Sequence, residues 1–443
     1  MDASVRPFDV TNRGVLAIAV PMTLAYLSTP LVGLADTFAI GQIGDAALIG
    51  GIAFGSIIFD LLFTTLNSLR SGTTGLVAQA FGADDRRQEA AVLFRAFLIA
   101  ALAGLAVILF RGPLLALALA FLGGSPAVQE AVTAYFAVRV LSAPFVFANY
   151  AILGHVLGLG RGGIGLLLQT ILNGVNVALN LYFVLALGMG VEGVALASVI
   201  AEIVAFAAGC MWLVVRLDRH HLPRAAEVFD WPRVRRMLAV NRDIMIRSFA
   251  LLFAFSLFAR QGAAQGDVVL AGNAILEKFF LIGGYFLDGF ATAAEQLVGR
   301  SIGARWRPAF DRAVSLTLRW GVVLAALCAL CLFLGGPAII RAITPAEDVR
   351  AMALAFLPYA ALTPLAGVVA FEMDGVFIGA TWSQEMRNMM LVSLALFVVA
   401  IFGLQSLIGN HGLWVALLVF LGARGVLLWL RLPVRAARAF AAP

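Results

Sequence analysis

Charged residues are scarce in this chain of 443 residues. Asp, Glu, Lys and Arg together make up 13% of it, whereas a soluble protein carries about 25%. Hydrophobic residues make up 62%. Water cannot solvate a surface of this composition, so a soluble globular protein is excluded and an integral membrane protein is indicated. The apolar runs are long and continuous, which predicts membrane helices and excludes the alternating pattern of an outer-membrane barrel.

Lysine, cysteine and histidine are nearly missing. Lys278 is the single lysine, and the net charge of +6 therefore comes from arginines, whose placement follows membrane topology and does not indicate nucleic acid. Three cysteines cannot form a disulfide framework. Cys328 and Cys331 make a C-x-x-C inside an apolar run, where we interpret them as packing residues. We predict no metal site and no cofactor beyond a coupling ion. The four histidines show no metal-ligand or catalytic spacing; they are His155, His220, His221 and His411.

Twelve apolar runs are long enough to cross a bilayer, so we predict an all-α protein of twelve transmembrane helices. Proline and glycine inside these runs are compatible with helices in lipid, because neighbouring helices satisfy the freed backbone groups. The predicted spans are 14–43, 46–80, 90–120, 128–158, 163–187, 191–216, 243–264, 268–299, 310–342, 351–378, 388–408 and 411–433.

Arginines gather on one side of this topology. Most of them lie in the terminal segments and in the even-numbered loops, and the odd-numbered loops carry only Arg111, Arg260, Arg341 and Arg350. The positive-inside rule then places both termini and the loop 217–242 in the cytoplasm. We expect a multi-pass protein of the inner (plasma) membrane that acts as a monomer in the lipid bilayer.

The loop 217–242 divides the spans six and six, and the two halves resemble each other. Gly154 and Gly158 match Gly375 and Gly379 at an offset of 221, and similar pairs occur elsewhere. An even number of spans per half gives both halves the same orientation. We therefore predict two six-helix bundles related by a pseudo-two-fold axis along the membrane normal, with a cleft between them. The predicted parts are an N-terminal lobe (1–217), a linker (218–242) and a C-terminal lobe (243–443).

A carboxylate lies deep in the first apolar run. Asp36 has no cationic partner one turn away on its own helix, and a charged group at the bilayer centre costs about 2.5–3.5 kcal/mol on insertion scales. Burial disfavours the charged form, which suits a group that gains and loses a proton. Pro21 and Pro30 each remove a backbone donor from this helix. We predict that Asp36 couples transport to a proton or another ion, and these two prolines make this helix the natural one to bend.

Amide side chains follow one face of the fifth span. Asn173, Asn176 and Asn180 are spaced by three and four residues, which places them on one helical face. Such a face must contact protein or water, either as a bond between helices or as the wall of a polar cavity, and we favour the cavity. Three further residues are assigned to the same wall or its surroundings: Ser198, Glu202 and Asn149.

The second half has acids of its own within the spans. Asp288 and Asp374 are its best candidates for ion coupling, and structural pairing is an equal alternative. The other acids of the second half are Glu277, Glu295 and Glu372. In the first half, Asp60, Arg70 and Arg139 are interpreted as internal pairs or as groups near helix ends.

Several motifs together resemble the multidrug and toxic compound extrusion (MATE) transporters, and within them the DinF-like branch. They run from the first span to the tenth and so cover most of the chain. They include Gly33-Leu-Ala-Asp36-Thr37, Thr74-Gly-Leu-Val-Ala-Gln79, Asn176-Val-Ala-Leu-Asn180, Gly188-Met-Gly190, Asn241-Arg-Asp-Ile-Met245, Leu287-Asp288-Gly289 and Asp374-Gly-Val-Phe-Ile-Gly379.

The resemblance implies twelve helices in two lobes, and export of cationic or amphipathic organic compounds in exchange for inward H⁺ or Na⁺. In DinF-like members the acid that Asp36 matches is thought to be protonated from outside, with the first helix bending at the proline that Pro21 matches. The positions of Asn176 and Ser198 would join this acid in a hydrogen-bonded network. The family often has an aspartate where this chain has Asn180. This departure leaves Asp36 as the expected proton carrier of the N-terminal lobe.

Other functions are retained as alternatives. Sodium coupling through the second-half acids is one, although a sodium site wants several oxygen ligands. A flippase for lipid-linked intermediates is another, but a pyrophosphate favours a cationic cavity, and the candidate residues here are acids and amides. A membrane-embedded enzyme would need a nucleophile and base or a metal cluster, and no such pattern occurs, so we predict no enzyme.

Overall fold

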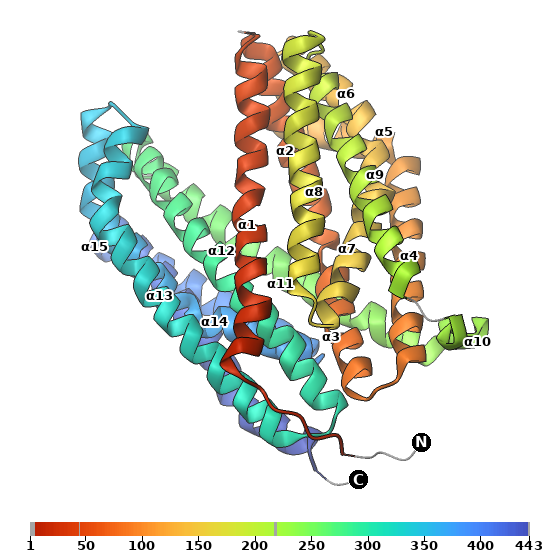
Figure 1. Ribbon diagram of the computed structural model, residues 1–443. Coiled ribbons are helices and arrows are strands. Elements are labelled where there is room, and N and C mark those ends of the chain that lie inside the picture. The colour runs from red at the N-terminus through yellow and green to blue at the C-terminus, as the bar shows by residue number, and fades with distance from the viewer. Residues whose placement is uncertain (1–4, 44, 217–218, 442–443) are drawn as a thin grey trace. The chain divides into compact units, whose positions relative to one another are not determined.

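The computed structural model describes residues 5–43, 45–216 and 219–441, and every element labelled in Figure 1 is a helix. The all-helical class predicted from the sequence is confirmed for these residues. The first half contains α1 (Asn12–Gly41), α2 (Ala46–Leu66), α3 (Ser68–Gly82), α4 (Arg86–Leu109), α5 (Arg111–Leu122), α6 (Pro126–Arg139), α7 (Ala143–Gly158), α8 (Gly162–Leu181) and α9 (Val191–Arg216). The second contains α10 (Ala225–Val228), α11 (Trp231–Ala263), α12 (Asp267–Gly303), α13 (Arg307–Ile343), α14 (Glu347–Gly379) and α15 (Ser383–Ala439).

Ten stretches of helix in the described residues are long and apolar enough to cross a membrane. One of them, α15, has non-helical backbone at Ile408 and Gly409, so it contains two spans joined by a kink. Helix α11 adds the apolar stretch 244–263. These are the twelve spans that the hydropathy predicts. Helix α11 begins at Trp231, well before the predicted 243, because hydropathy detects only its apolar part and its first turns carry arginines.

Contacts divide the chain into two compact units. One contains Leu27–Phe81 and Asp85–Asn241, and the other contains the chain up to Tyr26, Gly82–Asp84 and the chain from Arg242 onward. The predicted lobe boundaries at 217 and 243 differ from this division. The part of α1 up to Tyr26 belongs to the unit that contains the chain from Arg242 onward. The described linker residues 219–241 belong to the unit that contains Leu27–Phe81, because the linker is partly helical and packs on that unit.

The helices of the two halves repeat with a constant offset. Helices α4 and α13 begin at Arg86 and Arg307, and α7 and α14 end at Gly158 and Gly379, each pair 221 residues apart. A Cβ added to Gly154 would lie 2.5 Å from the Arg70 carbonyl oxygen, and one added to its counterpart Gly375 would lie 2.2 Å from the Ala291 oxygen. Both halves therefore have the same close helix contact, which only glycine permits.

The tight turns repeat as well. Three pairs of residues at the same offset have backbone in the left-handed region: Asp84 with Arg305, Gly160 with Thr381, and Gly188 with Gly409. Left-handed residues commonly end helices, and the position favours glycine. The shared turn geometry, together with the shared helix bounds, indicates that the two halves are copies of one scaffold.

The left-handed turn at Arg305 gives a testable stability difference. Arg305→Gly is expected to raise the free energy of unfolding by about 1 kcal/mol, because a side chain in this region costs that much or more. Arg312→Gly, an exposed site inside helix α13, is expected to lower it by about 1 kcal/mol. Equilibrium unfolding of the purified variants in detergent measures both. If the free energy of unfolding changed with the same sign in both variants, the left-handed conformation of Arg305 would be contradicted.

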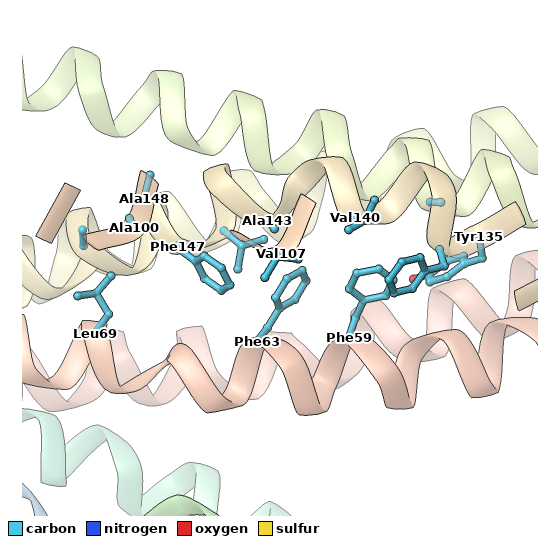
Figure 2. Packing of buried hydrophobic residues seen from close by; sticks show 14 of the residues in the cluster. Phe59, Phe63, Leu69, Ala100, Val107, Tyr135, Val140, Ala143, Phe147 and Ala148 are labelled. Carbon is cyan, nitrogen blue, oxygen red and sulfur yellow. The ribbon is translucent and has the colours of Figure 1, made fainter. Parts of the chain in front are cut away.

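Aromatic packing in the N-terminal half fixes helix α2 against α6 and α7. Phe59 stacks on Phe136 with ring centroids 5.1 Å apart, and Phe63 meets Phe147 edge-on at 5.8 Å. Figure 2 shows Phe59 and Phe63 of α2 facing Tyr135, Ala143 and Phe147 of the opposite helices. The guanidinium of Arg139 lies 5.3 Å from the centroid of Phe63, so the same cluster positions a cation.

Candidate functional site

Asp36 is buried, with 8% of its surface exposed. It lies in the last two turns of α1, which remains helical from Asn12 to Gly41. The side-chain amide of Asn180 in α8 donates a hydrogen bond to its Oδ1. An uncharged donor stabilises the carboxylate without fixing it in a direct ion pair, so the group remains able to accept a proton.

The amide face of α8 contacts two helices. The Asn173 amide donates to Ser28 Oγ of α1 at 2.7 Å, and the Asn176 amide donates to Ser198 Oγ of α9 at 2.8 Å. Together with the bond from Asn180 to Asp36, these contacts bring α1, α8 and α9 together along one face, and Figure 1 shows α1 beside α8. The spacing seen in the sequence therefore corresponds to a continuous polar seam.

Two amide oxygens in this seam are buried without a hydrogen-bond partner among the described residues, namely Asn176 Oδ1 and Asn180 Oδ1. Buried polar atoms are normally paired, and an exception requires an explanation. An amide oxygen is a good acceptor for the O–H of a protonated carboxyl group and a good ligand for a small cation. Both oxygens belong to the seam that contains Asp36.

A second acid lies in the same lobe. Glu202 of α9 is 8% exposed, and the Asn149 amide of α7 donates to its Oε2 at 2.8 Å and to its backbone oxygen at 3.0 Å. Asp36 and Glu202 thus share one arrangement, in which a buried carboxylate is held by a neutral amide. The structure places Asn149 as the partner of Glu202 and not as a partner of Asp36.

Arg139 is the residue that sequence reasoning did not assign to the site. Its positive charge acts on Asp36, Asp60 and Glu202 alike. It is half-buried at the end of α6, and its Nη1 donates to Ser142 Oγ at 2.7 Å. An arginine near a helix end in an apolar span is usually interpreted as reaching toward water, and no local spacing in the sequence connects it to Asp36.

The acid Asp374 of the second half is engaged in two ion pairs. Its Oδ2 accepts from Arg247 Nη1 at 2.9 Å and from Arg424 Nη2 at 2.8 Å. Arg424 is 3% exposed and Asp374 is 9% exposed. Two guanidinium groups therefore donate to one carboxylate oxygen, and this arrangement favours structural pairing over ion coupling.

Glu372, two residues earlier on α14, lacks, in the part of the chain that the structure describes, the arginine partners that Asp374 has. It is fully buried, and neither carboxyl oxygen has a hydrogen-bond partner among the described residues. Thr317 and Asp288 are its polar neighbours, but the Thr317 hydroxyl donates to the Ala313 backbone oxygen at 3.0 Å. The charge of Asp288, a predicted coupling residue, therefore acts on a buried acid that the sequence analysis did not select as a coupling residue.

Pro21 lies inside α1, which stays helical across it. No group of three His, Cys, Asp or Glu residues in the described chain is arranged to hold a metal ion. Of the paired cysteines, Cys328 is buried and Cys331 is exposed.

The model of the MatE family matches residues 21–182 and 245–403. The DNA damage-inducible protein F of Escherichia coli K12 is 36% identical over 425 residues, which cover 94% of this chain and 91% of that protein. A probable multidrug resistance protein NorM of Chromobacterium violaceum is 25% identical and covers 94% and 92%.

The fold is also found among solved structures. The Vibrio cholerae MATE transporter VcmN in the bent form superposes with a TM-score of 0.87 at 18% identity and covers 97% of both chains. An outward-facing multidrug resistance MATE transporter of the MOP superfamily superposes with a TM-score of 0.83 at 17% identity, again over 97% of both chains.

Proposed function

This chain belongs to the MatE family of membrane transporters, and from that premise we propose that it exports cationic or amphipathic organic compounds in exchange for protons that bind at Asp36. One observation carries the proposal: Asp36 is buried and hydrogen-bonded by the neutral amide of Asn180. A carboxylate in such a place can change its charge at moderate cost, and a change of charge is what ion exchange requires.

The exchange follows from competition for one negative group. With Asp36 ionised, the amide of Asn180 donates to it and an organic cation is attracted to the seam. Protonation removes the negative charge, so the cation loses its electrostatic attraction and leaves. The proton turns the carboxyl into a donor, and the unpartnered oxygens of Asn176 and Asn180 provide acceptors on the same face. Export results when the site opens to the two sides of the membrane in turn.

Arg139 and Glu202 set the electrostatic background for this exchange. Arg139 provides a positive charge that acts on Asp36. Glu202 is a second acid of the same lobe, and acids and amides make a better environment for a cation than for an anion. The proposal therefore favours a cationic substrate over the lipid-linked pyrophosphate of a flippase.

We propose that the protein lies in the inner membrane, with its arginine-rich termini and linker in the cytoplasm. The protein works as a monomer, with small molecules and the bilayer as its partners and without chemical turnover of the substrate. Bending of α1 at Pro21, where a backbone donor is missing, changes the surroundings of Asp36.

Sodium coupling through the second half is the other candidate, and one observation favours it. Glu372 is a buried acid with two oxygens that have no hydrogen-bond partner among the described residues, and the charge of Asp288 acts on it. Oxygen ligands of this kind suit a hard cation. The two ion pairs of Asp374 leave it less suited to this role.

Separate ion gradients distinguish the candidates. In proteoliposomes loaded with a fluorescent organic cation, an inward proton gradient is expected to drive dye efflux at an unchanged rate when sodium is removed from both sides. A proton ionophore is expected to abolish the efflux, because coupling requires the gradient. Efflux that follows a sodium gradient at equal pH on both sides would reject Asp36 as the coupling group in favour of the second half.

A further inference from the structure

A small cavity lined by arginines lies within the unit that contains Leu27–Phe81 and Asp85–Asn241, and none of its lining residues belongs to the polar seam. It has a volume of about 240 Å³, below the range of roughly 300–1,000 Å³ typical of pockets for drug-sized ligands. It is therefore too small for the exported compounds but large enough for a compact polar group. Its lining residues are Leu76, Asp85, Gln88, Arg95, Arg233 and Arg236.

Arg95 forms the buried wall of this cavity, with 2% of its surface exposed. Its Nε donates to the Val228 backbone oxygen at 3.0 Å, and its Nη2 donates to the Glu227 backbone oxygen at 2.6 Å. Both carbonyl groups belong to the short helix α10 in the linker. A guanidinium has five N–H donors, so three remain beyond these two bonds on a side chain that lines the cavity.

Two further arginines reach the cavity from the first turns of α11. Arg233 Nη1 donates to Gln88 Oε1 of α4, and Arg236 Nη2 donates to Gln79 Oε1 of α3 at 3.1 Å. Both of these hydrogen-bond partners are neutral amides. Arg233 also pairs with Asp230, with Nε and Oδ2 3.2 Å apart.

The single acid of the lining is already engaged. Asp85 is the N-cap of α4, and its Oδ1 accepts from the Gln88 backbone N–H at 3.0 Å. The lining therefore has three guanidinium groups against one carboxylate. Guanidinium groups bind phosphate oxygens with a matching fork geometry. A cavity of this size and charge fits one phosphate group.

We propose that this cavity binds a phosphate-bearing anion, which fastens the linker between the two halves onto helices α3 and α4. The ligand bridges Arg95 of α4 to Arg233 and Arg236 of α11, and so connects the transmembrane helices to the chain that leads into the second half. Two sources offer this chemistry: the headgroup of an anionic phospholipid, which is abundant at a cytoplasmic membrane surface, and a soluble phosphate.

Amide hydrogen exchange of residues 225–241 tests the proposal without any transport measurement, so a failure of proton coupling leaves it unaffected. The purified protein is compared in nanodiscs of phosphatidylcholine alone, in nanodiscs that also contain phosphatidylglycerol, and in phosphatidylcholine nanodiscs with added inorganic phosphate. Exchange of this segment is expected to slow about tenfold when the anion binds. Slowing by phosphatidylglycerol alone identifies a lipid headgroup, and slowing by inorganic phosphate as well identifies a soluble anion.

Variants separate the cavity from general attraction between arginines and anions. The double variant Arg233→Gln and Arg236→Gln is expected to lose the protection while it keeps the melting temperature of the parent, because both side chains are exposed. Arg235→Gln removes an exposed arginine of the same helix that does not line the cavity, and it is expected to keep the protection. The proposal is overturned if neither probe slows exchange in the parent protein, or if Arg235→Gln loses the protection to the same extent as the double variant.

Discussion

The Asp36→Asn variant is expected to fold and insert as the parent does but to lose proton-driven export, down to the level of liposomes without protein. Asparagine has nearly the same shape, and its oxygen still accepts the bond that the Asn180 amide gives to Asp36. The replacement of a charged acceptor by a neutral one costs about 1 kcal/mol at most sites, which leaves the fold intact. The side-chain amide of asparagine is not a titratable group, so proton exchange stops.

The measurement is dye efflux under an inward proton gradient, with the melting temperature of the same preparation as a check on folding. Glu202→Gln is the matched control, because Glu202 is also a buried acid held by a neutral amide in this lobe. It is expected to keep proton coupling, with a weaker attraction for the organic cation. Normal efflux by Asp36→Asn would exclude Asp36 as the carrier, and an equal loss in both variants would show that the two acids share the proton.

Asp374→Asn is expected to destabilise the protein strongly, by about 3–5 kcal/mol, the usual cost of removing one partner from a buried ion pair. The substitution leaves Arg247 and Arg424 without their shared carboxylate, and Arg424 is almost completely buried. The variant is expected to show a clearly lower melting temperature and a lower yield from membranes.

Glu372→Gln provides the comparison, two residues away on the same helix. Glu372 has no hydrogen-bond partner or ion pair among the described residues, so a neutral side chain removes a buried acid without leaving a charge behind. Its expected effect on stability is small or favourable. If Asp374→Asn were as stable as Glu372→Gln in thermal unfolding, the ion pairs of Asp374 would not be structural, and its predicted role in coupling would regain support.

Hydropathy alone predicted most of the fold, because a helix is the structure that satisfies every backbone group inside lipid. The predicted span 191–216 coincides with α9, whereas the start of α11 was placed too late because its first turns are polar. Spacing also predicted one face for Asn173, Asn176 and Asn180, since the period of a helix is fixed.

Partners from distant parts of the chain could not be predicted in the same way. Arg139 reaches Asp36 only through the packing of α6 against α2 and α9, and the ion pair of Arg247 with Asp374 joins residues 127 positions apart. The sequence presents Asp374 and Glu372 as two similar acids in one apolar run. Only the positions of the other helices distinguish the one that is paired from the one that is not.

Helix bounds and turns repeat at an offset of 221, but the buried acids of the two halves do not. At this offset Asp36 corresponds to Leu257 and Asn180 to Ile401, while Glu372 and Asp374 correspond to Ala151 and Leu153. The two halves therefore share helix bounds and turns but differ in their buried acids. If Asp36 is the proton carrier as proposed, protonation changes the charge of the first half alone, because the second half has an apolar residue at the matching position.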